Sequence, residues 1–127
     1  MLSYLANSVR PDIQMAVHQT DRFSTNPMRS HELAIVRIGR YLVNNLDRGV
    51  IHTINKSRGL EVYVDAYFAG GWDMADSRTG FVIRYAGCPV IWISKLQTEI
   101  VLSTAEAEYI AMSQALIEAL PVQRLAK

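Results

Sequence analysis

Apolar residues in the first part of the chain recur at helical spacing. After Arg10-Pro11-Asp12 one face collects Ile13, Ala16, Val17 and Thr20. Proline at the first helical position loses only an amide that would have no intrahelical partner, so a helix is expected to begin here. Asn26-Pro27 is expected to end it.

A second and clearer stripe runs from Ser30 to Leu46. Its apolar members are Ala34, Ile35, Ile38, Tyr41, Leu42 and Leu46, which predicts an amphipathic helix. Arg37 and Arg40 fall opposite the stripe, where a solvated helix face is expected.

The pattern changes after Gly49. A short strand is predicted over Val50–Ile54, and three β-rich runs follow at Leu60–Ala66, Gly80–Tyr85 and Val90–Ser94. The residues from Ala86 to Pro89 predict a hairpin connection between the last two runs. A final helix is expected from about Thr104 to Leu120, with Ser103 and Thr104 near its N-cap and Pro121 ending or kinking it.

This order predicts an α+β fold, in which N-terminal helices precede a three-stranded antiparallel meander and a helix packed on it. We expect a helical segment over residues 1–55 and a second domain over residues 56–127. The 127 residues are 50% hydrophobic with a net charge of +1, which excludes a strongly basic nucleic-acid coat protein. Cys88 is the one cysteine, no apolar run is long enough to span a bilayer, and no secretory leader is recognised.

Two carboxylates lie at positions where burying their charge would cost free energy. Asp65 follows a run of β-formers and precedes a glycine-rich stretch, where it could simply cap a turn or bind a cation. On a helical wheel, Glu108 falls inside the apolar arc of the last helix, between Ala115 and Ala119. A buried glutamate needs a partner, which would be a core Arg or Lys, or a divalent metal shared with another carboxylate.

Several strings resemble the ribonuclease H domain of copia-type retrotransposon polyproteins. Tyr63-Val64-Asp65-Ala66-Tyr67-Phe68-Ala69-Gly70 is similar to the Tyr-Val-Asp-x-Asp-Trp-Ala-Gly segment of that family, and Ser77-Arg78-Thr79-Gly80-Phe81 resembles the start of its second strand. Trp92-Ile93-Ser94-Lys95-Leu96-Gln97 and the stretch from Leu102 to Ala111 resemble its Trp-x-Ser-Lys-x-Gln and Ser-Ser-Thr-Glu-Ala-Glu-Tyr-x-Ala strings. Upstream, residues 4–13 and Arg40-Tyr41-Leu42 resemble the segment that connects reverse transcriptase to this domain.

The resemblance implies that residues 1–55 are a connection segment and residues 56–127 part of a ribonuclease H-like domain. In that family four carboxylates hold two Mg²⁺ or Mn²⁺ ions, which align water against the RNA strand of an RNA–DNA hybrid. Asp65 and Glu108 would be two of the four, as catalytic and metal-binding residues. The other two would follow the last helix, so the sequence is expected to be a C-terminally truncated fragment that is inactive alone. Tyr67 and Phe68 replace the family's Asp and Trp, and Pro121 stands where Trp is usual.

An alternative is a non-enzymatic protein descended from such a fragment. Arg37-Ile38-Gly39-Arg40 resembles the Arg-x-Leu-Arg signature of secreted oomycete RxLR effectors, although Gly39 replaces the Leu. The first hypothesis implies a cytoplasmic or nuclear location and an RNA–DNA hybrid as partner. The second implies secretion into a host cell and a host protein as partner. With an uncovered helix back bearing Ile110 and Ile117, self-association is expected, and no membrane partner.

Overall fold

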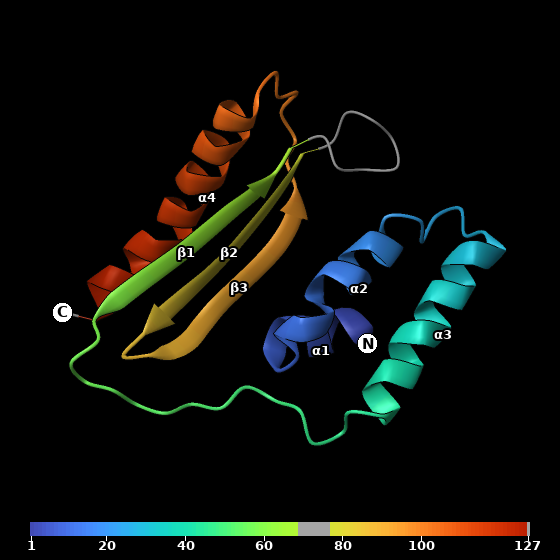
Figure 1. Cartoon of the computed structure of the whole chain (residues 1–127), viewed down its shortest axis with the longest axis horizontal. Helices are drawn as coiled ribbons and strands as arrows, with labels where there is room; N and C mark the ends of the chain where they lie inside the picture. Colours follow the sequence, from blue (N-terminus) through green and yellow to red (C-terminus); the bar gives the residue numbers. More distant parts are fainter. Residues whose placement is uncertain (69–76, 127) are drawn as a thin grey trace. The chain divides into compact units, whose positions relative to one another are not determined.

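The computed structural model describes residues 1–68 and 77–126, which form four α-helices, a short 3-10 helix and one antiparallel sheet (Figure 1). This confirms the predicted α+β fold with helices before the sheet and a helix after it. The chain divides into two compact units, Met1–Val50 and Ile51–Lys127. The division between residues 55 and 56 stays a sequence-based expectation.

The first unit is helical. It contains α1 (Leu2–Ser8), the 3-10 helix η1 (Pro11–Ile13), α2 (Gln14–Asp21) and α3 (Arg29–Val43). Its core is formed by Ala6, Ile13, Val17 and Ile38, with Leu2, Leu5, Tyr41 and Leu42 packed around them. Parts of the two predicted apolar stripes therefore pack against each other, because each amphipathic helix buries its apolar face against another. Ala16 and Ile35 of these stripes are exposed.

Two boundaries in this unit differ from the sequence-based expectation. Arg10-Pro11-Asp12 begins a 3-10 turn rather than the α-helix itself, which starts at Gln14. The helix expected to reach Leu46 ends at Val43, and Leu46 is 77% exposed in the turn that follows. Arg37 and Arg40 are exposed as expected.

The second unit contains a sheet of strand order β1-β2-β3, with β1 at Leu60–Tyr67, β2 at Arg78–Tyr85 and β3 at Cys88–Leu96. Both pairings are antiparallel, and a register shift between Ile83 and Arg84 interrupts the second. Each strand is longer than the β-rich run that predicted it, because backbone pairing continues past the apolar residues. Residues 50–54, by contrast, form no strand, and Ile51 and Ile54 remain exposed without a neighbouring strand to cover them.

The β2–β3 connection is a two-residue turn at Ala86 and Gly87, so Cys88 and Pro89 already belong to β3. Both turn residues have positive φ, 51° for Ala86 and 81° for Gly87. Such values match the twist of a tight hairpin, which glycine accepts more readily than alanine. The main chain before β1 supports this turn, since Asn55 donates its N–H to the carbonyl of Ala86 at 2.8 Å.

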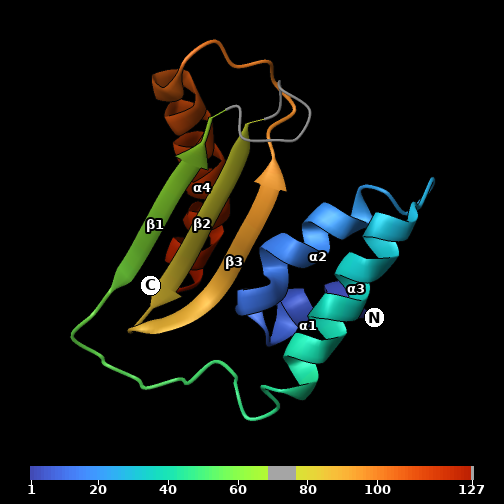
Figure 2. The ribbon, with the colours of Figure 1, turned by 45° about the vertical axis from the view of Figure 1, so that its right-hand side comes forward.

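The helix α4 (Thr104–Leu125) packs along one face of the sheet, over β1 and β2 (Figure 2). The core of this unit joins Phe81 and Ile83 of β2 to Ala115 and Ala119 of the helix, with Leu60, Val62, Val64, Ile91 and Ile93 packed around them. Pro121 lies inside the helix, so of the two outcomes expected at this position, an end or a kink, the end is wrong. The helix continues for four more residues, to Leu125.

Candidate functional site

Asp65 lies near the end of β1 and is exposed. Side chains alternate between the two faces of a strand, and its neighbour Val64 packs into the core beneath α4. Asp65 therefore points to the sheet face that α4 does not cover. Its cross-strand partner is Gly80, and Ser94 follows on β3, so no side chain separates the carboxylate from Ser94 on this face.

Glu108 lies in the second turn of α4 and is also exposed. The expectation that it falls on the buried stripe of this helix is wrong. The buried residues are Ala107, Ala111, Ala115 and Ala119, one row with four-residue spacing. The predicted arc was misplaced by about a quarter of a turn, because apolarity alone favoured the larger side chains. Small alanines instead let the helix backbone approach the sheet closely, and the larger apolar residues face outward.

A buried hydrogen bond sets this rotation of α4. The side-chain amide of Gln97, which follows β3, donates to the carbonyl of Ala107 at 2.9 Å and to the hydroxyl of Thr79 at 3.1 Å. Gln97 is 5% exposed and Thr79 and Ala107 are fully buried. The first turn of the helix is thereby fixed to β2 with its alanines inward. Sequence reasoning used Gln97 only as part of a motif and missed this role.

The start of α4 follows the sequence-based expectation closely. Ser103 is the N-cap, and its hydroxyl accepts the N–H of Glu106 at 3.2 Å. The carboxylate of Glu106 accepts the N–H of Leu102 at 2.9 Å, which confirms that an acid supports the cap. Glu106 is thus committed to the helix end, whereas Glu108 has its carboxylate in solvent.

Asp65 and Glu108 come from elements that meet at one end of the second unit, since β1 ends where α4 begins (Figure 1). They present their carboxylates on different sides, with Asp65 on the face away from the helix. Carboxylate oxygens are the donors that Mg²⁺ and Mn²⁺ prefer. Two exposed carboxylates would leave most positions of an octahedral ion to water. Among the residues 1–68 and 77–126, no group of three or more His, Cys, Asp or Glu could hold a metal ion.

Some expectations fall on residues 69–76. Trp72, an aromatic residue of a kind that can stack on nucleotides, lies outside the described part of the chain. Phe68 is half-buried in the turn after β1. Tyr63 and Tyr67 of β1 share the face of Asp65 and are 53% and 63% exposed, so aromatic surface does flank this carboxylate.

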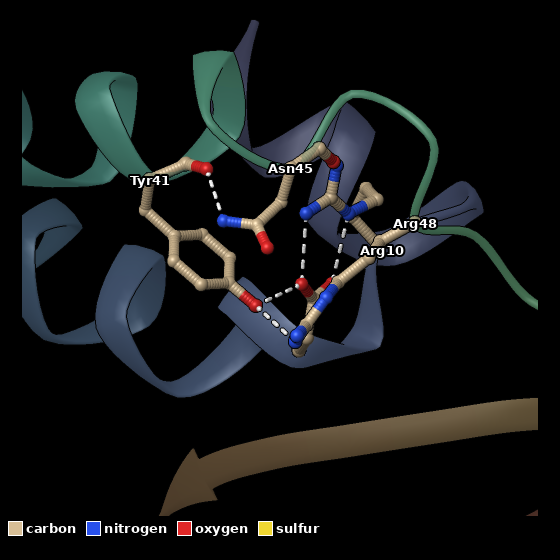
Figure 3. Close-up of polar contacts among 5 residues, drawn as sticks. Arg10, Tyr41, Asn45 and Arg48 are labelled. Atoms are coloured by element: carbon tan, nitrogen blue, oxygen red, sulfur yellow. Dashed lines mark hydrogen bonds and ion pairs between the residues drawn. The ribbon is translucent and has the colours of Figure 1, made fainter.

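A densely connected polar group lies in the first unit (Figure 3). Arg10 contacts Asp12 through two hydrogen bonds of 3.0 and 2.8 Å and donates a third, of 3.1 Å, to the carbonyl of Asn45. The hydroxyl of Tyr41 donates to the carboxylate of Asp12 at 2.8 Å. The hydrogen bonds from Arg10 lower the pKa of Asp12 to about 2, and the hydrogen bond from Tyr41 adds to the effect.

This network connects η1 to the end of α3, so its role is structural. The only sign of this network in the sequence is the pair of charged residues on either side of Pro11.

None of the helices described over residues 1–68 and 77–126 is long and apolar enough to cross a bilayer.

Comparison with known proteins finds relatives along most of the chain. It is 37% identical over 108 residues to the retrovirus-related Pol polyprotein from transposon RE1 of Arabidopsis thaliana, and this match covers 85% of the chain. It is 39% identical over 117 residues to the Pol polyprotein from transposon TNT 1-94 of Nicotiana tabacum, covering 89% of the chain. The chain spans only 7% and 8% of these two polyproteins.

A third relative is much shorter. The chain is 35% identical over 118 residues to secreted RxLR effector protein 161 of Plasmopara viticola, and the match covers 93% of the chain and 83% of that protein. No protein-family model matches the chain. No solved structure matches it either.

Proposed function

The chain belongs to the family that comprises this segment of retrotransposon Pol polyproteins and secreted RxLR effector protein 161, and we propose that it is the ribonuclease H part of a copia-type element with its preceding connection segment. Its ancestral reaction is hydrolysis of the RNA strand of an RNA–DNA hybrid, carried out in the cytoplasm or nucleus. The isolated 127-residue chain is inactive.

One observation carries this proposal. Asp65 stands late on the first strand of an antiparallel meander, and Glu108 stands early on the helix that follows the meander, at the same end of the unit (Figure 1). The order of these elements, with the motif strings on them, supports the proposal. Retrotransposon relatives along 85–89% of the chain support the same origin.

The proposed reaction uses two divalent ions, which activate water and stabilise the leaving oxygen. Asp65 and Glu108 would bind one of these ions weakly, through one carboxylate each. Asp65 and Glu108 are two of the four carboxylates that the reaction is expected to use, and no group of three or more His, Cys, Asp or Glu among residues 1–68 and 77–126 could hold the second ion. The second ion is needed to neutralise charge on the leaving group, so cleavage should not exceed the background rate.

Cleavage of an end-labelled RNA–DNA hybrid in millimolar Mg²⁺ or Mn²⁺ tests the proposal. The wild-type chain and Asp65→Asn should give the same background. A fusion that adds the Pol segment following this region in a relative should cleave the hybrid, and Asp65→Asn in that fusion should abolish cleavage. A fusion that folds and binds hybrid but is unaffected by Asp65→Asn would refute the site.

A second function has its own support, because a protein of similar length carries the name of a secreted RxLR effector and the chain covers 83% of it. In that case the chain acts in a host cell through its surface. The string Arg37-Ile38-Gly39-Arg40 does not support this function as a targeting signal. It lies in the middle of α3 and Ile38 is 6% exposed in the core, whereas a linear targeting signal must be accessible.

Host-cell expression separates the two functions. An effector should alter host defence responses, and the double variant Asp65→Asn/Glu108→Gln should leave that effect intact. If the chain derives from a nuclease and has no effector activity, neither the wild type nor the double variant should alter the host's defence responses.

A further inference from the structure

The outer side of α4 carries a row of exposed apolar residues that the sheet does not use. Each member follows one residue after a buried alanine, so the row is rotated by about 100° from the face that packs on the sheet. Met112, Leu116 and Leu120 form the row and are 47%, 55% and 49% exposed. Tyr109 and Ile117 flank it and are 72% and 65% exposed. Ile110 and Ile117 were both expected to be exposed; Ile117 is exposed, whereas Ile110 is half-buried.

Charged residues continue the row at both ends. Glu108 stands four residues before Met112, and Arg124 stands four residues after Leu120, and both are exposed. Residues at four-residue spacing form a ridge, and such ridges are the surfaces by which helices most often pack on one another. The ridge turns by about 160° around the helix from Glu108 to Arg124, so its apolar centre is bordered by an acid at one margin and by a base at the opposite margin.

The ridge is symmetric about Leu116. Glu108 and Arg124 each lie 8 residues from it (116 − 108 = 8 and 124 − 116 = 8), and Met112 and Leu120 each lie 4 residues from it. When a second copy of the ridge is laid over the first in the antiparallel direction, Leu116 meets Leu116, Met112 meets Leu120 and Glu108 meets Arg124. A parallel arrangement would instead place like charges together at both ends.

We propose that this chain forms a two-fold symmetric homodimer in which the ridge of α4 (Glu108, Met112, Leu116, Leu120 and Arg124) packs antiparallel on the same ridge of a second copy. A two-fold interface uses one patch that is complementary to itself, which this ridge satisfies in both apolarity and charge. The contact covers side chains that the sheet leaves in water, and burial of exposed apolar area is the main driving force for such association. The proposal does not depend on a nuclease origin.

Sedimentation of the full chain over a concentration series measures the dimer. Leu116→Lys places two cations against each other at the symmetry centre, so it should weaken dimerisation at least tenfold. Ile100→Lys is the matched control, because Ile100 is 82% exposed and lies outside α4, and it should leave the dimer unchanged. Circular dichroism checks that both variants keep the fold.

The charges give a second test that is independent of the apolar centre. Arg124→Glu should weaken the dimer several-fold because it faces Glu108 of the other copy. Adding Glu108→Arg in the same chain restores opposite charges and should return the affinity close to that of the wild type. A double variant as weak as Arg124→Glu alone would contradict the antiparallel register.

Disulfide trapping determines the direction. Leu116→Cys should cross-link with itself under mild oxidation, and the wild type controls for Cys88, which is buried. Met112→Cys alone should not cross-link, but its mixture with Leu120→Cys should. Efficient cross-linking of Met112→Cys with itself would show a parallel pair, and a wild-type chain that stays monomeric at all concentrations would overturn the proposal.

Discussion

The side-chain amide of Gln97 and the main-chain carbonyl of Ala107 are joined by a buried hydrogen bond of 2.9 Å. The two residues stand ten positions apart, on either side of the loop that leads from β3 into α4. The carbonyl would otherwise lie in the protein interior with only its helical partner to satisfy it. This contact determines which side of α4 meets the sheet.

Gln97→Ala should lower the free energy of unfolding by about 2 kcal/mol, because it removes two buried hydrogen bonds and leaves Thr79 without this donor. Urea unfolding followed by circular dichroism measures the change. Gln123→Ala is the matched control, since Gln123 is exposed on α4, and it should change stability by less than about 0.5 kcal/mol. Equal effects of the two variants would show that Gln97 does not anchor the helix.

The alanine row of α4 makes a second prediction. Ala111 is fully buried where the helix backbone approaches the sheet. Ala111→Leu should destabilise the chain by about 1–3 kcal/mol, because the added side chain forces the helix away from β1 and β2. Glu118→Leu adds similar bulk at an exposed position of the same helix and should be close to neutral. A neutral Ala111→Leu in thermal unfolding would mean that the helix packs by another face.

The carboxyl of Asp12 predicts a pH dependence. Its pKa is lowered from 3.8 to about 2 in the folded chain, chiefly by the hydrogen bonds from Arg10. Its contribution is therefore fully present above about pH 4 and is lost as the pH falls toward 2. Because the side chain is 31% exposed, we expect it to contribute about 1 kcal/mol.

Asp12→Asn should remove that contribution at neutral pH and flatten the acid limb of stability between pH 4 and pH 2. Unfolding in urea at several pH values compares the two chains. Asp47→Asn, at an exposed site, should keep the acid limb of the wild type. The assignment fails if wild type and Asp12→Asn lose stability in parallel over this range.

The hairpin turn gives a fourth prediction. Gly87→Ala should destabilise by about 1 kcal/mol, because Gly87 has a φ of 81°. Space is not the cause, since an added Cβ would lie 3.5 Å from the carbonyl of Thr53, an ordinary contact. Ala86→Asn should stabilise by a few tenths of a kcal/mol, since asparagine tolerates positive φ better than alanine. Gly49→Ala is the control in thermal unfolding, and a stabilising Gly87→Ala together with a destabilising Ala86→Asn would contradict the assigned turn.

The sequence by itself determined the order and type of the main elements. Periodicity separates α3 from the strands because the spacing of apolar residues differs between a helix and a strand. Glycine at position 87 indicated the hairpin, and Ser103 with Glu106 indicated the start of α4. These signals are local, since each depends on residues within one or two turns of the chain. The motif strings likewise indicated an origin in a retrotransposon Pol polyprotein, which the relatives support.

Only the tertiary structure decided how these elements face one another. The wheel placed Glu108 among buried residues because it weighed apolarity, whereas the sheet selects the row of alanines for close approach and leaves Glu108 exposed. Residues 50–54 favour a strand locally but have no partner strand, and Pro121 is tolerated within α4. Each outcome depends on contacts between distant residues, such as Gln97 with Thr79, and such contacts leave no periodic trace in the sequence.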